Sequence, residues 1–536
     1  MRSLGINELS FMRRHFAFIL ILVATAIMRF VILFVSQTHV TSDEAIIGLM
    51  AKHILEGRYF PFYFYGTSYN ASCAWEAYLA VVPFAIAGVG VVALKTPMVL
   101  LSLVCLTLFY MMTTRLYSIR VATLSSFIFA LWPGLMKWHF QPRGYAFYFL
   151  FIPALIILFL IIENEKVRRT RDFFFFGLAC GIALWSMELL LIIFAGLWVL
   201  LFLRRKFSIR TFAACVGGFT IGYAPAIWWN LTHGLRNWHF VFFEKPEAGG
   251  LGERFGLPAW RDIFLYEMPK FFSTDTVLWY YPGTPWTGHV LYFVTAIAVV
   301  IAAWCALPKI RSAFSSGFAA TDTTKDLLML TLVGASFVPY IIAPLRVPGY
   351  FLGASFFMSI LIARCIDRFL AQKEMSLRAL GATILLATII CGAVAVIETA
   401  THNQIETLTL CPNRQDHCMM RVPGADIDGV KHDLEQNGIK AVWTTISFVY
   451  PLIFETGEKL IASESIFGVD RPVYPPSIPK PEPSSQDRTV FVVETNSPYR
   501  PEIETILAQK GGVPPRITEH GTLTVIEQRF ASESLR

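Results

Sequence analysis

Two adjacent acidic residues, Asp43 and Glu44, follow the first long apolar run of the chain. Thr41 and Glu44 have the spacing of a capping box, which predicts a helix from about 43 to 56. Both acids can simply be favourable charges at the positive N-terminus of that helix. A carboxylate placed there can also take a proton from a reacting group, as a general base does. The spacing alone leaves both interpretations open.

The helix that would carry this acidic pair is amphipathic. Its expected apolar face consists of Ile46, Leu49, Met50, His53 and Ile54. This pattern predicts a helix that lies along a membrane surface. Gly57 would end it, and an aromatic run over residues 59–65 follows.

The composition indicates a polytopic membrane protein. Of the 536 residues, 55% are hydrophobic and only 15% are charged, and the mean hydropathy is +0.54. Soluble domains have about 25% charged residues, so a disordered chain, a soluble enzyme and a disulfide-rich secreted protein are excluded. The net charge of +7 comes from short basic clusters between apolar runs. Such clusters set membrane topology, so no nucleic-acid partner is expected.

The apolar runs predict an α-helical fold with about eleven transmembrane helices. The run 16–36 is interpreted as an uncleaved signal anchor with a cytoplasmic N-terminus, because Arg13 and Arg14 precede it. The run 77–94 contains proline and glycine and is expected to pack at the surface without crossing. The regions expected outside are 37–76, 137–143, 229–288 and 398–536. Whether 173–203 is one helix or two is left open.

Residues 398–536 are expected to form a small extracytoplasmic α/β domain that follows a transmembrane domain of residues 1–397. The expected helices are 426–437, 447–455 and 501–510, and the expected strands are 440–445, 459–463, 489–494 and 522–527. The last strand, helix and strand would form a βαβ unit.

Two of the nine cysteines, Cys411 and Cys418, flank a polar outside segment. In an oxidising compartment this spacing favours a disulfide. His417 keeps a metal site open as the alternative, although the second half of a zinc signature is missing. No dedicated ligand cluster is evident, so no cofactor is assigned and a divalent metal stays open.

The acidic-pair loop resembles the GT-C superfamily of membrane glycosyltransferases, and within it the bacterial family-39 type. The pattern DEA…GL…A…IL.G..FP begins at Asp43, and FYG…Y…S..EAYLA follows it. The resemblance extends over most of the chain through QPRGYAF at 141–147, GYF at 349–351 and FETGEKLIAS at 454–463. The type includes protein O-mannosyltransferases, lipid A aminoarabinose transferases and galacturonosyltransferases of the lipopolysaccharide core. Thr67 stands where relatives often have Gln.

The resemblance implies transfer of a hexose or pentose from a polyprenyl-phosphate carrier to a lipid, glycan or protein acceptor, with inversion at the anomeric carbon. Such a reaction needs a base for the acceptor hydroxyl and cations that face the leaving phosphate. On this resemblance Asp43 is the expected general base. Glu44 is the alternative base, or it positions the acceptor.

Basic residues near the outside ends of spans are candidates for binding the donor phosphate. Arg143 and Arg346 suit phosphate through paired hydrogen bonds, while snorkelling at the interface is the alternative role. Lys137 and His139 share the short outside loop of Arg143. Arg29 lies inside the first span, where a cation costs about 2.5–3.5 kcal/mol. It should face either the donor phosphate or an acid such as Glu188.

Three further residues, Tyr65, Glu76 and Tyr350, are candidates for substrate binding. The expected location is the cell inner membrane, with the site and the C-terminal domain in the periplasm. The partners would be membrane lipids, the lipid-linked donor and the acceptor. Competing interpretations are a flippase or transporter of lipid-linked sugars, an enzyme like an O-antigen ligase or polymerase, and an assembly platform built on the C-terminal domain.

Overall fold

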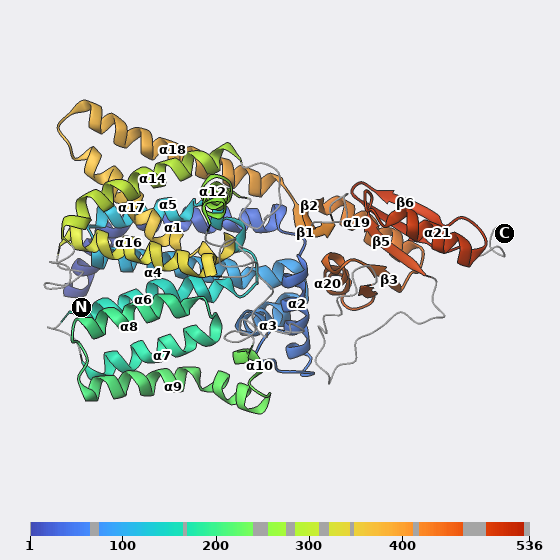
Figure 1. Ribbon diagram of the computed structural model, residues 1–536, viewed down its shortest axis with the longest axis horizontal. Coiled ribbons are helices and arrows are strands. Elements are labelled where there is room, and N and C mark those ends of the chain that lie inside the picture. Colours follow the sequence, from blue (N-terminus) through green and yellow to red (C-terminus); the bar gives the residue numbers. More distant parts are fainter. Residues whose placement is uncertain are drawn as a thin grey trace.

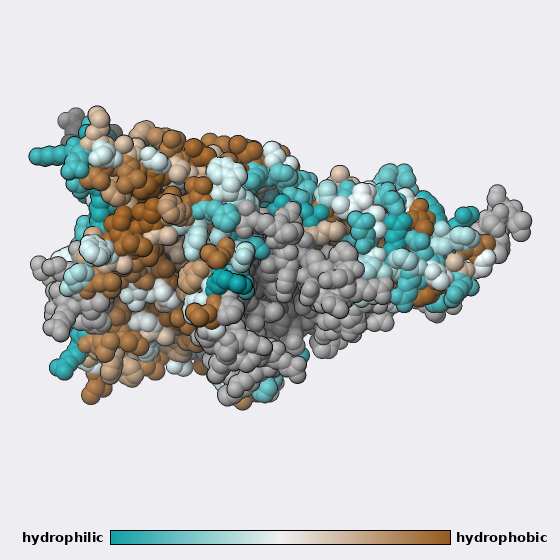
Figure 2. Space-filling model, turned by 45° about the horizontal axis from the view of Figure 1, so that its top comes forward, coloured by the Kyte–Doolittle hydropathy of each residue, from teal (hydrophilic) through white to brown (hydrophobic). Residues whose placement is uncertain are grey.

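The computed structural model describes residues 2–64, 74–164, 169–239, 256–274, 285–309, 321–342, 348–410, 417–464 and 489–529. Long helices form a bundle, and a smaller α/β region lies beyond one end of it (Figure 1). Apolar side chains cover much of the visible flank of the bundle, whereas hydrophilic ones prevail on the α/β region (Figure 2). The chain is an α-helical polytopic membrane protein with a C-terminal α/β region, as the composition predicts.

The longer helices, in chain order, are α1 (Arg2–Ser36), α4 (Val91–Leu116), α5 (Ile119–Ala130), α6 (Tyr145–Glu163), α7 (Thr170–Ser186), α8 (Leu190–Leu203), α9 (Ile209–Thr232), α14 (Trp286–Ala306), α16 (Asp322–Ile342), α17 (Ala354–Leu370) and α18 (Met375–Thr401). The shorter helices and turns are α2 (Ser42–Leu55), α3 (Trp75–Ala87), η1 (Pro133–Leu135), η2 (Lys137–His139), α10 (Arg236–Trp238), α12 (Leu257–Asp262), η4 (Ile263–Glu267), α13 (Met268–Phe271), η5 (Leu307–Lys309) and η6 (Pro348–Phe351).

Six of the described helices are long and apolar enough to cross a membrane, or seven if α5 and the turns up to His139 form one bent span. The number of crossings therefore stays a prediction. The run 77–94 is not one helix, because Gly88 adopts a φ of 85° and separates α3 from α4. Residues 173–203 form two helices, α7 and α8, which are broken at 187–189.

Helices α7 and α9 pack backbone to backbone through two glycine pairs. Gly177 and Gly181 in α7 face Gly218 and Gly222 in α9. A Cβ atom on any of the four would overlap a backbone carbonyl oxygen of the other helix. This i, i+4 pattern of small residues lets membrane helices approach closely, where dispersion contacts replace the hydrophobic effect.

Replacing Gly218 by Ala is expected to destabilise the protein by about 1–3 kcal/mol, because the new methyl group must push α7 away. The matched control is Gly217→Ala, since a Cβ there meets no atom within 4 Å. Thermal unfolding of the purified protein in detergent measures both variants. Equal melting temperatures for the two would contradict the close α7–α9 contact.

A buried acidic residue in the first turns of α16 ties several helices together. Asp326 of α16 is fully buried and accepts hydrogen bonds from Tyr117 Oη (2.9 Å) and Arg364 Nε (3.2 Å). Arg368 also pairs with it. Because a buried carboxylate needs such partners, these contacts hold α16, α17 and the turn between α4 and α5 in register.

The C-terminal region contains a two-stranded and a five-stranded sheet. Its elements are β1 (Gln404–Leu410), β2 (His417–Pro423), α19 (Gly424–Gln436), β3 (Ala441–Thr444), α20 (Ile446–Glu455), β4 (Ile461–Glu464), β5 (Val490–Glu494), α21 (Arg500–Gly511), β6 (Arg516–His520) and β7 (Leu523–Glu527). Strands β1 and β2 pair antiparallel, and the larger sheet has the order β4-β3-β5-β7-β6. The elements expected from the sequence are present.

The expected βαβ unit over 489–527 is wrong. Strand β7 pairs antiparallel with β5, because the additional strand β6 follows α21 and turns back at Gly521. Strand β6 escaped detection because it is largely exposed on both faces and lacks apolar alternation. The parallel unit is β3–α20–β4 instead. Helix α18 runs on to Thr401, and a domain division near 397/398 remains our proposal.

Candidate functional site

Helix α2 begins at the acidic pair, as the capping box predicts. The backbone N and the hydroxyl of Thr41 both donate to Glu44 Oε2, at 2.8 and 2.9 Å. The helix runs from Ser42 to Leu55 and lies at the end of the bundle that faces the C-terminal region (Figure 1). Its burial extends beyond the expected apolar face, because α3 packs against it and α20 covers it as well.

Glu44 points inward and pairs with a lysine of α4. Lys95 Nζ lies 3.2 Å from Glu44 Oε1, and both side chains are almost completely buried. The same ammonium group donates to the carbonyl oxygen of His39 (2.7 Å). The interaction joins the start of α2 to the start of α4. Sequence reasoning missed Lys95, although a single lysine directly after the apolar run 77–94 was a usable signal.

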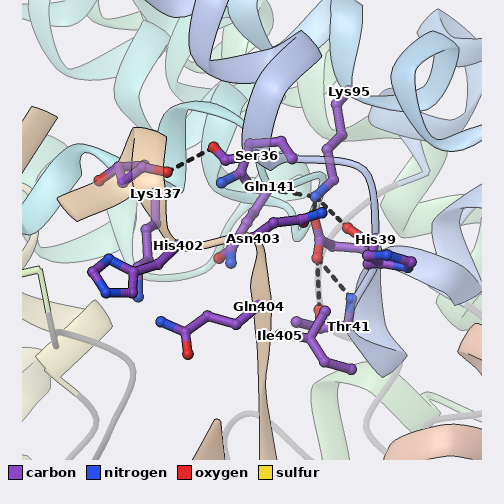
Figure 3. Close-up of a pocket in the computed structure, with 13 residues that line it drawn as sticks. Ser36, His39, Thr41, Lys95, Lys137, Gln141, His402, Asn403, Gln404 and Ile405 are labelled. Carbon is purple, nitrogen blue, oxygen red and sulfur yellow. Dashed lines mark hydrogen bonds and ion pairs between the residues drawn. The ribbon is translucent and has the colours of Figure 1, made fainter. Parts of the chain in front are cut away.

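The Glu44–Lys95 pair forms part of a small polar pocket. Lys95 descends toward His39 and Thr41, and Gln141 and Asn403 lie alongside (Figure 3). The lining residues are Ser36, Gln37, His39, Thr41, Glu44, Lys95, Lys137, Gln141, Thr399, His402, Asn403, Gln404 and Ile405. The pocket therefore lies where α1, α4 and α18 meet the first strand of the C-terminal region.

Asp43 points to a different partner, Arg143. Arg143 Nη2 donates to Asp43 Oδ2 at 2.5 Å. The Asp43 side chain is 37% exposed and the Arg143 side chain 21%, so solvent or a ligand can reach the pair. The guanidinium carbon also lies 5.6 Å from the centre of the Trp138 ring, a cation–π arrangement. The acidic pair thus divides its contacts: Glu44 is buried, and Asp43 is accessible.

Glu76 fixes the backbone that carries Arg143. It is buried in the first turn of α3, and its carboxyl oxygens accept from the backbone N of Gly144 (2.7 Å) and Ala146 (3.0 Å). These N–H groups belong to the start of α6, where intrahelical partners are lacking. Burial raises the pKa of Glu76 to about 7, although the two backbone hydrogen bonds oppose that shift.

Tyr350 lies near the loop that carries Arg143. It belongs to η6, whose Gly349 packs so closely that a Cβ would lie 3.1 Å from both the Trp138 ring and the Tyr145 hydroxyl. Tyr145 is the residue that opens α6 after the Arg143 loop. The sequence-predicted residues Asp43, Arg143, Glu76 and Tyr350 therefore cluster around the beginning of α6.

Other candidates lie apart from this cluster. Arg29 is fully buried in α1 and donates to Ser102 Oγ (2.6 Å), whereas Glu188 accepts from Asn237 (3.3 Å). His139 is buried, and its ring lies edge-on to Phe129 and Phe149.

Lys137 lines the pocket beside Glu44. Arg346, Tyr65 and Cys411 lie outside the described residues, as does the side chain of Cys418, and the predicted disulfide stays a prediction. Within the described ranges no group of three or more His, Cys, Asp and Glu side chains could hold a metal.

The buried Glu76 carboxyl should make stability depend on pH. Its pKa is raised on folding, so the protonated form is favoured and its stabilisation is lost as pH rises from about 4.5 to 7. Relative to Glu76→Gln, the free energy of unfolding of the wild type should fall by up to about 3 kcal/mol over that range. Thermal unfolding in detergent from pH 4.5 to 8 tests this, and a difference that does not vary with pH would contradict it.

No family model matches the chain, and no curated protein sequence matches it. Solved structures do. The chain is similar to ArnT from Cupriavidus metallidurans in the apo state, with 12% identity, a TM-score of 0.56, and coverage of 95% of this chain and 97% of that one. The structure of ArnT bound to undecaprenyl phosphate matches with 13% identity, a TM-score of 0.57, and coverage of 96% and 99%.

An oligosaccharyltransferase from Archaeoglobus fulgidus, tethered to an acceptor peptide, matches with 12% identity and a TM-score of 0.52. That alignment covers 85% of this chain and 65% of the oligosaccharyltransferase. A structure of the archaeal oligosaccharyltransferase AglB from the same organism, in complex with an inhibitory peptide and a dolichol-phosphate, matches with a TM-score of 0.50 and 11% identity. At these identities the likeness concerns the fold alone.

Proposed function

We propose that this protein is an inverting glycosyltransferase that moves a hexosyl or pentosyl group from a polyprenyl-phosphate carrier to a cell-envelope acceptor. The observation that carries the proposal is the accessible Asp43–Arg143 pair at the end of a GT-C bundle. It brings a candidate base and a candidate phosphate-binding cation into contact. Similar folds whose structures hold undecaprenyl phosphate and dolichol-phosphate support the donor class.

In the proposed reaction, an acceptor hydroxyl oxygen attacks the anomeric carbon of the sugar from the face opposite the phosphate. Asp43 accepts the hydroxyl proton as the new C–O bond forms. The bond between the anomeric carbon and the phosphate oxygen breaks, and the electron pair leaves with the polyprenyl phosphate. Arg143 faces the charge that develops there. A guanidinium has five N–H donors, so it can bind a phosphate while one nitrogen holds Asp43.

The contacts favour Asp43 over Glu44 as the base. Glu44 is 1% exposed, accepts two hydrogen bonds from Thr41 and pairs with Lys95. A carboxylate with these partners cannot meet an acceptor hydroxyl without breaking the start of α2. We assign Glu44 a positioning role and the proton transfer to Asp43.

We propose that the site faces the periplasm from the inner membrane. Helix α1 runs from the N-terminal end of the bundle to the end that carries α2 (Figure 1). Arg13 and Arg14 precede its apolar part, and basic residues favour the cytoplasmic side. The α2 end and the C-terminal region would then lie outside the cytoplasm.

Asp43→Asn is expected to lower sugar transfer by about 10²–10⁴-fold, because the side chain can no longer accept the hydroxyl proton. Mass spectrometry of cell-envelope lipids and glycans, at matched protein levels, should show the loss of one sugar, whose mass identifies donor and acceptor. Asp172→Asn is the control, since Asp172 lies in the first turn of α7 as Asp43 lies in the first turn of α2. An unchanged envelope with Asp43→Asn would reduce Asp43 to a helix cap and favour a flippase.

Arg143→Gln is expected to weaken binding of undecaprenyl phosphate by about 10–100-fold, the value of a charge-assisted hydrogen bond of 1.5–3 kcal/mol. Native mass spectrometry or a thermal-shift titration with undecaprenyl phosphate alone measures the change. Arg120→Gln is the control, because Arg120 pairs with Asp367 in the first turn of α5. Unchanged affinity in Arg143→Gln would exclude Arg143 from the phosphate site.

A further inference from the structure

Helix α20 of the C-terminal region packs directly on α2. Its Phe454 is almost fully buried and lies over Gly48, in the middle of α2, where a Cβ would overlap the ring. The same ring stacks against Phe84 of α3, with centroids 6.2 Å apart. The Phe454 ring therefore leaves no room for a side chain at position 48 of α2.

A second contact lies at the N-terminal side of α2. Glu455 accepts from the backbone N of Val40 (3.2 Å) and pairs with His39 Nδ1 (3.1 Å). Lys431 of α19 also donates to this carboxylate (2.8 Å). Burial alone would raise the pKa of Glu455, but His39 and Lys431 lower it. The loop that leads from α1 into the Asp43 turn is thus held by a charged network from the C-terminal region.

A third contact lies at the C-terminal end of α2. Glu458 pairs with Lys52 Nζ (2.5 Å) and His53 Nε2 (3.1 Å). Gly457 and Glu458 have φ values of 65° and 66°, so the chain turns sharply after α20. A non-glycine residue rarely adopts this conformation, and it persists where surrounding contacts enforce it. The turn places the Glu458 carboxylate on the end of α2.

We infer that residues 454–458 act as a splint that positions α2, and through it Asp43, against Arg143. The inference rests on the proposed function of Asp43. A helix of 14 residues is marginal by itself, and the three contacts hold its entry, its middle and its end. Since a displacement of about 1 Å at a reacting group can cost about 10²-fold in rate, Phe454, Glu455 and Glu458 are positioning residues for transfer.

The test is the Glu455→Gln, Glu458→Gln double variant of the full-length protein. Transfer should fall at least tenfold in kcat, while affinity for undecaprenyl phosphate stays within twofold, because Arg143 is untouched. Amide hydrogen exchange over 39–58 should accelerate, while strands β5 and β7 stay protected. The control is Glu519→Gln, which removes the Arg500–Glu519 pair (2.7 Å) elsewhere in the C-terminal region, and it should match the wild type in all three measurements.

A steric pair tests the same splint and also serves if the double variant does not fold. Gly48→Ala should lower kcat and speed exchange over 39–58, because the methyl group displaces the Phe454 ring. Adding Phe454→Leu should restore both toward wild type. The splint would be overturned if Gly48→Ala and the Glu455→Gln, Glu458→Gln variant both kept wild-type exchange and kcat. It would also be overturned if adding Phe454→Leu to Gly48→Ala restored neither. If the wild type transfers no sugar, the proposed function fails, while the exchange data still decide whether residues 454–458 hold α2.

Discussion

The buried ion pair between Glu44 and Lys95 is the constraint on which the site depends. Each charge is almost entirely removed from water, and either alone would carry a large desolvation penalty. The start of α2 must therefore lie over the start of α4. Successive residues on a helix are about 100° apart, so burying Glu44 turns Asp43 sideways to the place where Arg143 meets it. One structural acid thereby orients a neighbouring acid that remains accessible.

The opposite side of the site is set by a second buried acid. Glu76 accepts hydrogen bonds from two backbone N–H groups at the beginning of α6, those of Gly144 and Ala146, which follow Arg143 in the chain. The guanidinium is thus placed by backbone contacts on one side and by the Trp138 ring on the other. Two buried carboxylates and one lysine build a frame around an exposed carboxylate and guanidinium. This arrangement leaves the Asp43–Arg143 pair partly accessible above buried partners.

The α/β region is part of this frame. Helix α20 covers α2 from the side opposite the membrane bundle, and strand β1 contributes Gln404 and Ile405 to the polar pocket. Its charged contacts concentrate on the two ends of α2, whereas the middle contact is a ring on a glycine. The helix that bears the proposed base thus receives support from a region more than 350 residues later in the chain. The distribution of contacts links the architecture of the C-terminal region to the geometry of Asp43.

Local patterns in the sequence predicted the fold class and most of the secondary-structure elements of this protein. The apolar runs predicted a polytopic helical protein, the Thr41–Glu44 spacing predicted the start of α2, and alternating segments predicted most elements beyond residue 403, because capping, hydropathy and strand periodicity act over a few residues. Contacts between distant residues carry no such local signal. Only the tertiary structure decided that Glu44 meets Lys95, that Asp43 meets Arg143, that Glu76 caps α6, and that β7 runs antiparallel to β5. The physical reason is that each of these contacts joins residues far apart in the chain, so it depends on how the helices and strands pack and not on the local pattern.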